Sequence, residues 1–283
     1  MQNHLSEFKI TTMSRVLGVS RSGFYRFRQR AGQPTMRQQK RMVLDKLVAE
    51  AFAAQKMRAG SPRLVLDLRD QGHVYDRKTV AASMQRQNLR AKAAKKYKAT
   101  TNSRHDLPVA PNLLAQDFSA GAPNQKWVSD ITYLLTDEGW LYLAVIIDLF
   151  SRLVVGWAMT ERMTAGLVCE ALQMALWRRN MPAGVILHSD RGSQYCSNAY
   201  QNLMAKHQLI CSMSGKGHCY DNACAESFFH SLKVEAIHGE RFASREKMRQ
   251  SVFEYIEVDY NRTRRHSATG YISPMAFEAL QHA

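Results

Sequence analysis

The second half of the chain alternates between short apolar runs and helical stripes of apolar residues, the pattern of a mixed α/β domain. Three apolar runs, at 126–135, 140–150 and 151–159, lie close enough together to form a β-meander. Further strands are predicted at 184–190 and 209–214. Apolar residues at helical spacing predict helices over 164–180, 198–207, 223–237 and 245–262. This order predicts one mixed sheet that begins with an antiparallel meander and is flanked by helices.

The first third of the chain shows only helical patterns, and its first segment has the layout of a helix-turn-helix. A short helical stretch over 13–17 meets Gly18, and Ser20 is placed to cap a second helix that begins at Arg21. A short helix, a glycine-containing turn and a basic second helix are the parts of a DNA-binding helix-turn-helix. Arg21 and Arg26 on the second helix are therefore candidate DNA contacts.

A second unit of the same layout follows between 61 and 87, after a long amphipathic helix predicted over 36–56. Gly72 breaks its first helix, and Asp76 is a good N-cap for its second helix. Two such units in one region favour DNA binding more strongly than either unit alone. In the second helix Val80 and Met84 are spaced as a buried face requires, which leaves Arg77, Lys78 and Arg86 for outside contacts.

The distribution of charge supports the same division of the chain. Residues 1–115 hold 23 Lys and Arg against 7 Asp and Glu, whereas residues 116–283 hold 16 against 17. The helical part therefore carries the whole excess, which indicates a polyanion-binding region attached to a region of another function. The stretch 91–112 is basic and then polar, shows no apolar periodicity, and is interpreted as a linker along a phosphate backbone. The expected parts are a first helix-turn-helix-like unit (1–34), a helical region with the second unit (35–90), a basic linker (91–115) and the α/β domain with a C-terminal helical motif (116–283).

Composition excludes several other classes of protein. No run of 18 apolar residues is present, so no transmembrane helix is expected, and the N-terminus lacks the layout of a signal peptide. The five cysteines are an odd number and are expected to be free thiols in a reducing cytoplasm. Cys219 and Cys224 beside His218 lack a second pair at zinc-finger spacing, and no phosphate-cradling glycine loop is found. We therefore expect neither a structural zinc nor a nucleotide cofactor.

Three carboxylates stand where the predicted elements can bring them together. Asp130 lies in the first strand, Asp190 ends the fourth, and Glu226 opens the helix after the fifth. The order of elements matches the ribonuclease H-like arrangement, in which the first and fourth strands are neighbours. Adjacent carboxylates repel one another unless cations neutralise them, and hard oxygen ligands suit Mg²⁺ or Mn²⁺. Two such ions in one site can promote cleavage or joining of a phosphodiester.

The helix predicted over 223–237 is a finer test of this grouping. Glu226, His230 and Lys233 follow one another at i, i+4 and i+7, on a face adjacent to the apolar stripe. Glu226 would then reach the edge of the sheet, Lys233 would hold a phosphate next to the metals, and His230 is a candidate DNA contact. By itself the spacing also fits a solvated pair on an ordinary surface helix.

Three sequence motifs carry a resemblance to a known family. They are WVSDITYL, HSDRGSQYCS and YDNACAESFFHSLKVE, with 35 residues between Asp190 and Glu226. They are similar to the signature of the OrfB-type transposases of the IS-three family of bacterial insertion sequences, within the retroviral-integrase superfamily. The resemblance implies that Asp130, Asp190 and Glu226 are the metal-binding catalytic triad and that Lys233 contacts DNA. The segment 255–278 resembles the family's C-terminal motif.

The same resemblance implies a DNA transposase that binds the ends of its element and both cleaves and joins strands. It implies two divalent ions per active site, Mg²⁺ or Mn²⁺, a circular intermediate of the element, and a homo-oligomer in a synaptic complex with element ends and target DNA. An upstream-frame protein, or a fusion to it, is a further expected partner, whereas a membrane is not. The expected location is the bacterial cytoplasm. Departures from the family pattern at Ser61-Pro62-Arg63 and at Arg191 put only fine DNA contacts in doubt.

Several polar residues outside the triad have competing interpretations. Arg191 is either a phosphate clamp beside the metals or a surface charge, and Gln194 is a candidate contact with the strand being cut. Arg264, in a basic run after a helix, is either a DNA contact or a solvated helix end. The other interpretations are Asp148 as a decoy or helper of the triad, Asp221-Asn222 as a helix cap, and Glu235 as solvated. His188 either lies near the metals or, as we favour, is packed in its strand.

Two alternative functions fit parts of the pattern. A DNA-binding regulator or a decayed transposase would keep the helix-turn-helix units without catalysis, although the intact triad argues against decay. A ribonuclease H-like nuclease acting in repair would cut but not join DNA, and would not need two helix-turn-helix units.

Overall fold

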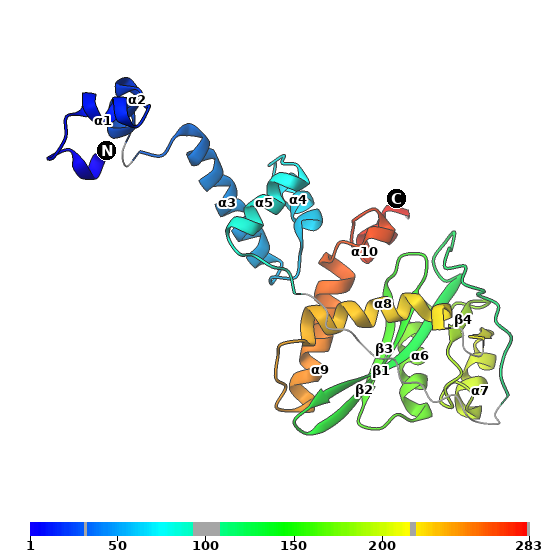
Figure 1. Cartoon of the computed structure of the whole chain (residues 1–283). Coiled ribbons are helices and arrows are strands. Elements are labelled where there is room, and N and C mark those ends of the chain that lie inside the picture. Colours follow the sequence, from blue (N-terminus) through cyan, green and yellow to red (C-terminus); the bar gives the residue numbers. More distant parts are fainter. Residues whose placement is uncertain (31–32, 93–107, 216–218, 282–283) are drawn as a thin grey trace. The chain divides into compact units, whose positions relative to one another are not determined.

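The computed structural model describes residues 1–30, 33–92, 108–215 and 219–281 (Figure 1). The chain divides into two compact units, Met1–Ala91 and Lys92–Ala283. Within the described residues, no helix has both the length and the apolar character needed to cross a membrane.

The first unit contains helices only, and it begins with a short helical pair. After a 3₁₀ turn (Gln2–His4), α1 (Ile10–Val16) is followed by α2 (Arg21–Gln29). Gly18 between them has a φ of +63°, left-handed backbone that favours glycine. Ser20 Oγ accepts a hydrogen bond from Gly23 N (3.0 Å) at the start of α2. The predicted turn and the predicted cap are both confirmed.

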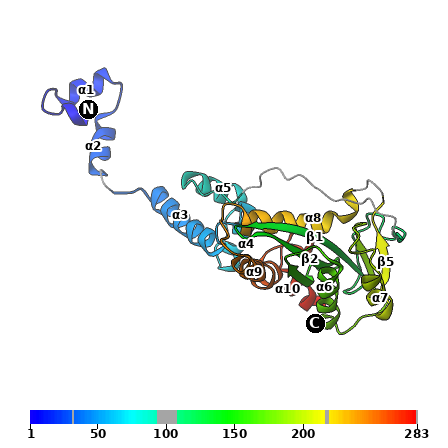
Figure 2. The same cartoon turned by 90° about the horizontal axis from the view of Figure 1, so that it is seen from below.

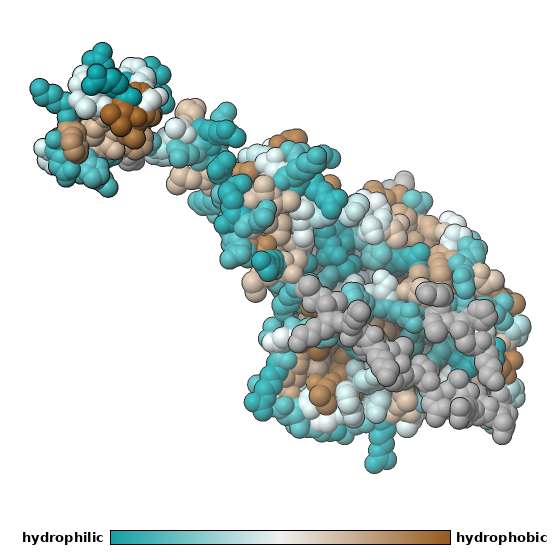
Figure 3. Space-filling model, viewed as in Figure 1, coloured by the Kyte–Doolittle hydropathy of each residue, from teal (hydrophilic) through white to brown (hydrophobic). Residues whose placement is uncertain are grey.

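The surface of this helical pair is partly apolar. Figure 3 shows brown, apolar atoms exposed among teal ones on this part of the molecule. Met13 and Phe24 are its only buried apolar side chains among the described residues, because two short helices enclose little volume. The exposed apolar side chains are Phe8, Val16, Leu17, Val19, Tyr25 and Phe27.

Three further helices enclose a small core of their own. They are α3 (Met36–Ala54), α4 (Ser61–Asp70) and α5 (Arg77–Arg86). Asp76 caps α5 as predicted, accepting hydrogen bonds from Lys78 N (2.7 Å) and Thr79 N (3.0 Å). The core confirms the predicted buried spacing of α5, and its main members are Leu44, Val48, Phe52, Leu64, Leu68, Val80 and Met84.

The second unit is built on a five-stranded sheet of order β3-β2-β1-β4-β5. The predicted antiparallel meander is formed by β1 (Lys126–Thr136), β2 (Gly139–Asp148) and β3 (Val154–Thr160). Parallel to β1 runs β4 (Ile186–Ser189), and parallel to β4 runs β5 (Ile210–Met213). The predicted mixed sheet, with the first and fourth strands as neighbours, is therefore confirmed.

Helices cover both faces of this sheet (Figure 2). One face packs against α6 (Ala165–Arg178) and α7 (Asn198–Lys206), and the other against α8 (Ala223–Leu232) and α9 (Arg245–Phe253). The chain ends with α10 (Pro274–Gln281). Alternate residues of the central strands point to opposite faces, so each strand contributes to both cores.

Two helices predicted as uniform α-helices change their hydrogen bonding part-way. α8 continues as a π-helical turn over Lys233–Ile237, where His238 N donates to Lys233 O (2.7 Å). α9 continues as a π-helix over Glu254–Thr263, which ends where Arg264 N donates to Asp259 O (2.7 Å). π-helical turns are rare in proteins, and many of those that do occur lie at functional sites.

Most of the predicted linker, residues 93–107, lies outside the described residues. Its last part belongs to the second unit and packs against β5 and the core. Leu113 N donates to Ser212 Oγ (2.9 Å), Met213 N donates to Pro111 O (3.3 Å), and Leu114 is buried in the core beneath α8. The stretch 111–114 therefore lies along β5.

Candidate active site and nucleic-acid interface

The pairing of two parallel strands brings Asp130 and Asp190 together. β1 and β4 pair with a constant register, Trp127 with Leu187 and Val128 with His188. Asp190 is the residue after the end of β4, so the parallel pairing brings it next to β1, and its charge acts on Asp130. Every second residue of a strand points to the same face of a sheet. Asp130 alternates with Val128 and Leu134 on the same side of β1, so its carboxylate extends from the face that α8 covers.

The turn after β4 holds the Asp190 carboxylate. Gly192 N donates to Asp190 Oδ1 (2.9 Å). A Cβ at residue 192 would lie 3.0 Å from that oxygen and 3.0 Å from Gln194 Oε1. Glycine at position 192 thus leaves room for the Asp190 carboxylate.

The start of α8 is tied to the strand that carries Asp130. Asn222 Nδ2 donates to Ser129 O (3.1 Å), so the helix begins beside the residue that precedes Asp130. Glu226 lies one turn along α8 and is exposed. This side-chain amide therefore ties the start of α8 to β1, and the charge of Glu226 acts on Asp130.

The predicted capping role of Asp221-Asn222 is wrong. α8 begins without a side-chain cap. Asp221 Oδ2 instead accepts hydrogen bonds from Gly215 N and from Asn112 Nδ2, both at 2.9 Å. Asp221 and Asn222 thus bond to residues far away in the sequence, Asn112 and Ser129, and the local sequence does not reveal these contacts.

The other two carboxylates of the candidate triad act electrostatically on Asp130. Burial raises the pKa of Asp130 well above its ordinary value, and the charges of Asp190 and then Glu226 raise it further. The charge of Lys233 acts on that pKa in the opposite direction. Burial also raises the pKa of Glu226. A bound cation would stabilise the charged form of these carboxylates, which the site otherwise disfavours.

The donor set fits Mg²⁺ held by pairs of carboxylates. Across the described parts of the chain, no three His, Cys, Asp or Glu side chains are arranged to hold one metal ion. Mg²⁺ is usually bound through only one or two carboxylates, while waters and substrate phosphates complete its octahedron. Asp130 feels the charge of both Asp190 and Glu226, so it is the residue that two such pairs would share.

Lys233 lies between the carboxylates and an aromatic ring. Its Nζ is 5.1 Å from the centroid of the Tyr133 ring. Burial lowers the pKa of Lys233 to about 8, and the charge of Asp130 opposes that change. His230, nearly one turn earlier, is exposed. Of the predicted helix face, Glu226 and His230 thus reach solvent, and Lys233 is partly buried beside Asp130.

Arg191 and Gln194 both hydrogen-bond to the protein next to the triad. Arg191 Nε donates to Ser214 O (2.5 Å), and Gln194 Nε2 donates to Met163 O (3.1 Å). Both residues keep part of their surface exposed within four positions of Asp190. Their DNA contacts remain predictions.

Arg264 forms a buried ion pair instead of facing DNA. Its guanidinium donates to both oxygens of Glu235 (2.9–3.1 Å) and to Ser231 Oγ (2.9 Å), and it lies 5.5 Å from the Tyr260 ring centroid. The side chains of Arg264 and Glu235 are only 12% and 9% exposed. The prediction that Glu235 is solvated is therefore wrong, and Arg264 has a structural role. The sequence did not indicate these roles because the two partners are 29 residues apart.

His188 and Asp148 are also structural. His188 is buried between Ser212 Oγ (2.8 Å) and Ser214 Oγ (3.2 Å), and burial lowers its pKa to about 4. This confirms the prediction that it is packed. Asp148 is fully buried and accepts hydrogen bonds from Asn124 N (2.8 Å) and Trp127 Nε1 (3.2 Å). Asp148 thus braces the start of β1.

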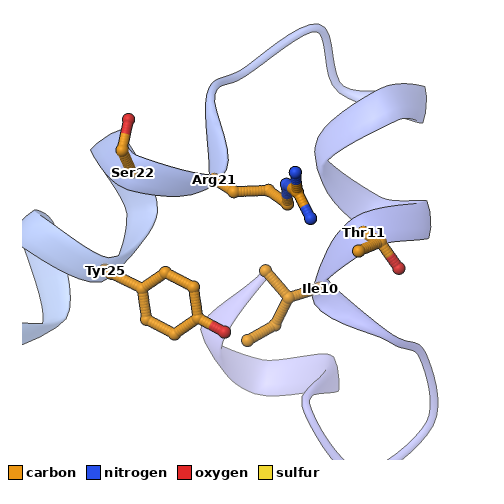
Figure 4. A pocket seen from close by; sticks show the side chains of 5 residues that line it. All are labelled: Ile10, Thr11, Arg21, Ser22 and Tyr25. Atoms are coloured by element: carbon orange, nitrogen blue, oxygen red, sulfur yellow. The ribbon is translucent and has the colours of Figure 1, made fainter.

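The predicted DNA contacts of the first unit are exposed. Arg21 and Arg26 lie on α2, and Arg77 and Lys78 form the first turn of α5. Arg86 is exposed as well, and it forms an ion pair with Asp45. A pocket of about 510 Å³ opens between α1 and α2 (Figure 4), lined by Ile10, Thr11, Arg21, Ser22 and Tyr25.

A buried polar contact behind the aspartates was missed by sequence reasoning. Ser129 Oγ and Tyr195 OH are hydrogen-bonded at 3.0 Å. Burial raises the pKa of Tyr195 well above its ordinary value, and the charges of Asp130 and Asp190 raise it further. These residues are 66 positions apart, and their only signal in the sequence is that each lies in a motif with a triad aspartate.

Comparison with known families assigns the same segments. A family model described as an integrase core domain matches residues 120–219, and a second model of that description matches residues 226–281. An HTH-like domain model matches residues 38–97.

Similar proteins extend over nearly the whole chain. The transposase InsF of insertion sequence IS3A from Escherichia coli K12 is 60% identical, covering 98% of this chain and 96% of that protein. An uncharacterised 31 kDa protein of insertion element IS600 from Shigella sonnei is 47% identical, covering 95% and 98%. The catalytic core domain of HTLV-2 integrase, solved in complex with magnesium, aligns at 14% identity with a TM-score of 0.43, covering 56% and 99%.

Proposed function

Because this chain belongs to the IS3 family of insertion-sequence transposases, we propose that it cleaves DNA at the ends of its element and joins those ends to target DNA. The observation that supports this proposal is that β1 pairs in parallel with β4, which Asp190 follows, and that the charges of both Asp190 and Glu226 act on Asp130. Of the two alternatives, neither a DNA-binding regulator nor a repair nuclease accounts for a triad combined with an HTH-like domain.

We assign metal binding to Asp130, Asp190 and Glu226. Two Mg²⁺ (or Mn²⁺) ions held there would activate the attacking oxygen and stabilise the leaving oxygen of a phosphodiester. The raised pKa of Asp130 supports this assignment, because the site disfavours its own negative charge unless a cation is present.

The proposed reaction is an in-line displacement at phosphorus that is used twice. Water attacks a phosphodiester at the end of the element and releases a 3′-hydroxyl, which then attacks a phosphodiester of the target. Lys233 would hold a phosphate of the reacting strand beside Asp130. His230, Arg191 and Gln194 would contact the same strand around the triad.

The helical unit is proposed to bind the ends of the element. Arg21, Arg26, Arg77 and Lys78 are exposed cations on the second helix of each pair, where a helix-turn-helix meets DNA. Phosphate contacts of this kind position a protein, and base contacts add specificity. A homo-oligomer would be needed to hold two ends together, and an upstream-frame protein is a further proposed partner.

Strand joining tests the catalytic assignment directly. The wild type, Asp190→Asn and Glu170→Gln are incubated with Mg²⁺ and oligonucleotides of the element's terminal repeats. We expect joined product from the wild type and from Glu170→Gln, an exposed carboxylate on α6, and no product from Asp190→Asn. Equal joining by Asp190→Asn would refute the assignment. Tight end binding without cutting by the wild type would favour a regulator, and cutting without joining would favour a nuclease.

Thermal denaturation tests metal binding without reference to activity. Mg²⁺ that binds only the folded protein raises its melting temperature, and Asp190→Asn should abolish that rise. Without metal, Asp190→Asn should melt above the wild type, because it removes a charge that acts on Asp130. A Mg²⁺ response that survives in Asp190→Asn would contradict the proposed ligands.

A further inference from the structure

An exposed aromatic pair lies at the far end of the strand that carries Asp130. The rings of Tyr133 on β1 and Trp140 on β2 meet edge to face, with centroids 5.1 Å apart and an interplanar angle of 89°. Trp140 is 44% exposed, and its cross-strand partner Leu135 is 61% exposed. Trp140 therefore presents part of its ring to the outside next to the Tyr133 ring.

A cation connects this aromatic pair to the active site. Lys233 Nζ lies 5.1 Å from the Tyr133 ring centroid, and its charge also acts on Asp130. β4 pairs with β1 only as far as Val128, so β4 does not cover the edge of β1 at Tyr133, and Lys233 contacts the ring there. Lys233 thus lies near both the Asp130 carboxylate and the aromatic pair of Tyr133 and Trp140.

The turn that carries Trp140 is held in place from several sides. Arg245 Nε donates to Trp140 O (3.2 Å), and Arg245 N donates to Glu138 Oε2 (2.8 Å). Thr136 Oγ1 donates to Gly139 O (2.7 Å), and Gly139 has a φ of +107°. A ring presented on a fixed turn loses little conformational freedom when it binds a ligand.

We propose that the Trp140 ring, in edge-to-face contact with Tyr133, is a stacking surface for an unpaired base of the DNA end whose phosphate lies beside Lys233. This inference rests on the proposed function. Proteins that hold single-stranded DNA combine a cation for the backbone with aromatic rings on which bases stack. Tyr133 is three residues from Asp130, roughly 10 Å of strand, and alternation along β1 turns the two side chains to opposite faces of the sheet. Lys233 lies between them at the edge of β1, so the DNA strand would pass Lys233 and turn around that edge to bring a base to the aromatic pair.

The test measures binding of terminal-repeat duplexes that carry an abasic site at each of the first positions flanking the joined phosphate. Binding is measured in a Glu226→Gln background, so the result does not depend on catalysis, and strand joining by the otherwise unaltered chain reports the proposed function separately. We expect Trp140→Ala to weaken binding of the intact end about 5- to 100-fold, and Trp140→Phe to recover most of the loss. Trp177→Ala, which removes a tryptophan that is 73% exposed on α6, should have no effect.

The decisive comparison combines the two changes. At one position the abasic site should weaken binding of the Trp140 chain but cause no further loss with Trp140→Ala, because both changes remove the same contact. Losses that add at every position would overturn the proposal, as would unchanged binding by Trp140→Ala. Melting temperatures of the variants show whether each is folded, and Trp140→Phe retains the ring if Trp140→Ala is not.

Discussion

The buried ion pair between Glu235 and Arg264 gives a sharp prediction about stability. Arg264 donates three hydrogen bonds to the carboxylate, and Tyr255 OH donates a fourth to Glu235 Oε2 (3.1 Å). The pair joins the π-helical turn after α8 to the residue that follows the π-helix after α9. Arg264→Ala would leave the Glu235 charge buried without its main partner.

The magnitude follows from this burial. Removing one partner of a buried, hydrogen-bonded ion pair costs about 3–5 kcal/mol, because the remaining charge has lost both water and counter-charge. Arg241 and Asp137 form an exposed pair in the same unit, at 3.0 Å and with side chains 86% and 43% exposed. Arg241→Ala should therefore cost at most about 1 kcal/mol.

Urea denaturation of Arg264→Ala, Arg241→Ala, Glu235→Ala and the double variant Glu235→Ala/Arg264→Ala measures these costs. We expect the double variant to lose much less than the sum of the two single losses, since removing Glu235 also removes the uncompensated charge. Equal losses for Arg264→Ala and Arg241→Ala would refute the reasoning. If, in addition, Arg264→Ala weakened DNA binding, Arg264 would regain its place among the DNA contacts.

Three further predictions concern buried groups of the α/β unit. Because burial lowers the pKa of His188 to about 4, the unfolded chain takes up a proton near pH 6.5 while the folded chain does not. Stability should therefore fall by up to about 3 kcal/mol between pH 6.5 and 4, and unfolding curves of His188→Asn should lack that part of the pH dependence. Gly156→Ala should destabilise by roughly 3 kcal/mol, because its Cβ would lie 2.2 Å from Ala171 O, whereas Gly166→Ala in α6 should be neutral or stabilising in the same denaturation assay. Gly192→Ala should reduce the Mg²⁺-dependent rise in melting temperature by displacing the Asp190 carboxylate, and an unchanged rise would show that the carboxylate position does not matter.

Local sequence was sufficient where an interaction spans only a few residues. Ser20 and Asp76 cap their helices as predicted, because an N-cap bonds to backbone two or three positions ahead. The strands were predictable because a buried strand must be apolar, whatever its neighbours are. The boundary between basic and neutral parts of the chain likewise needs no structure.

The candidate site was only half predictable. Sequence motifs single out Asp130, Asp190 and Glu226, but the closeness of the two aspartates depends on the register of β1 with β4. The tie between Asn222 and Ser129 spans 93 positions and carries no local pattern. The aromatic pair beside Lys233 likewise forms only when the β1–β2 hairpin aligns Tyr133 and Trp140.

The sequence by itself determined which residue types are present for catalysis, where the helices and strands lie, and which part of the chain is basic. Only the tertiary structure decided what each charge does. Arg264 and Arg86 are cations in basic or exposed-looking stretches, yet one is buried on Glu235 and the other is bound to Asp45. A charged side chain takes its role from a partner that the fold brings near. That partner lies 29 or 41 residues away here, beyond the reach of any local pattern.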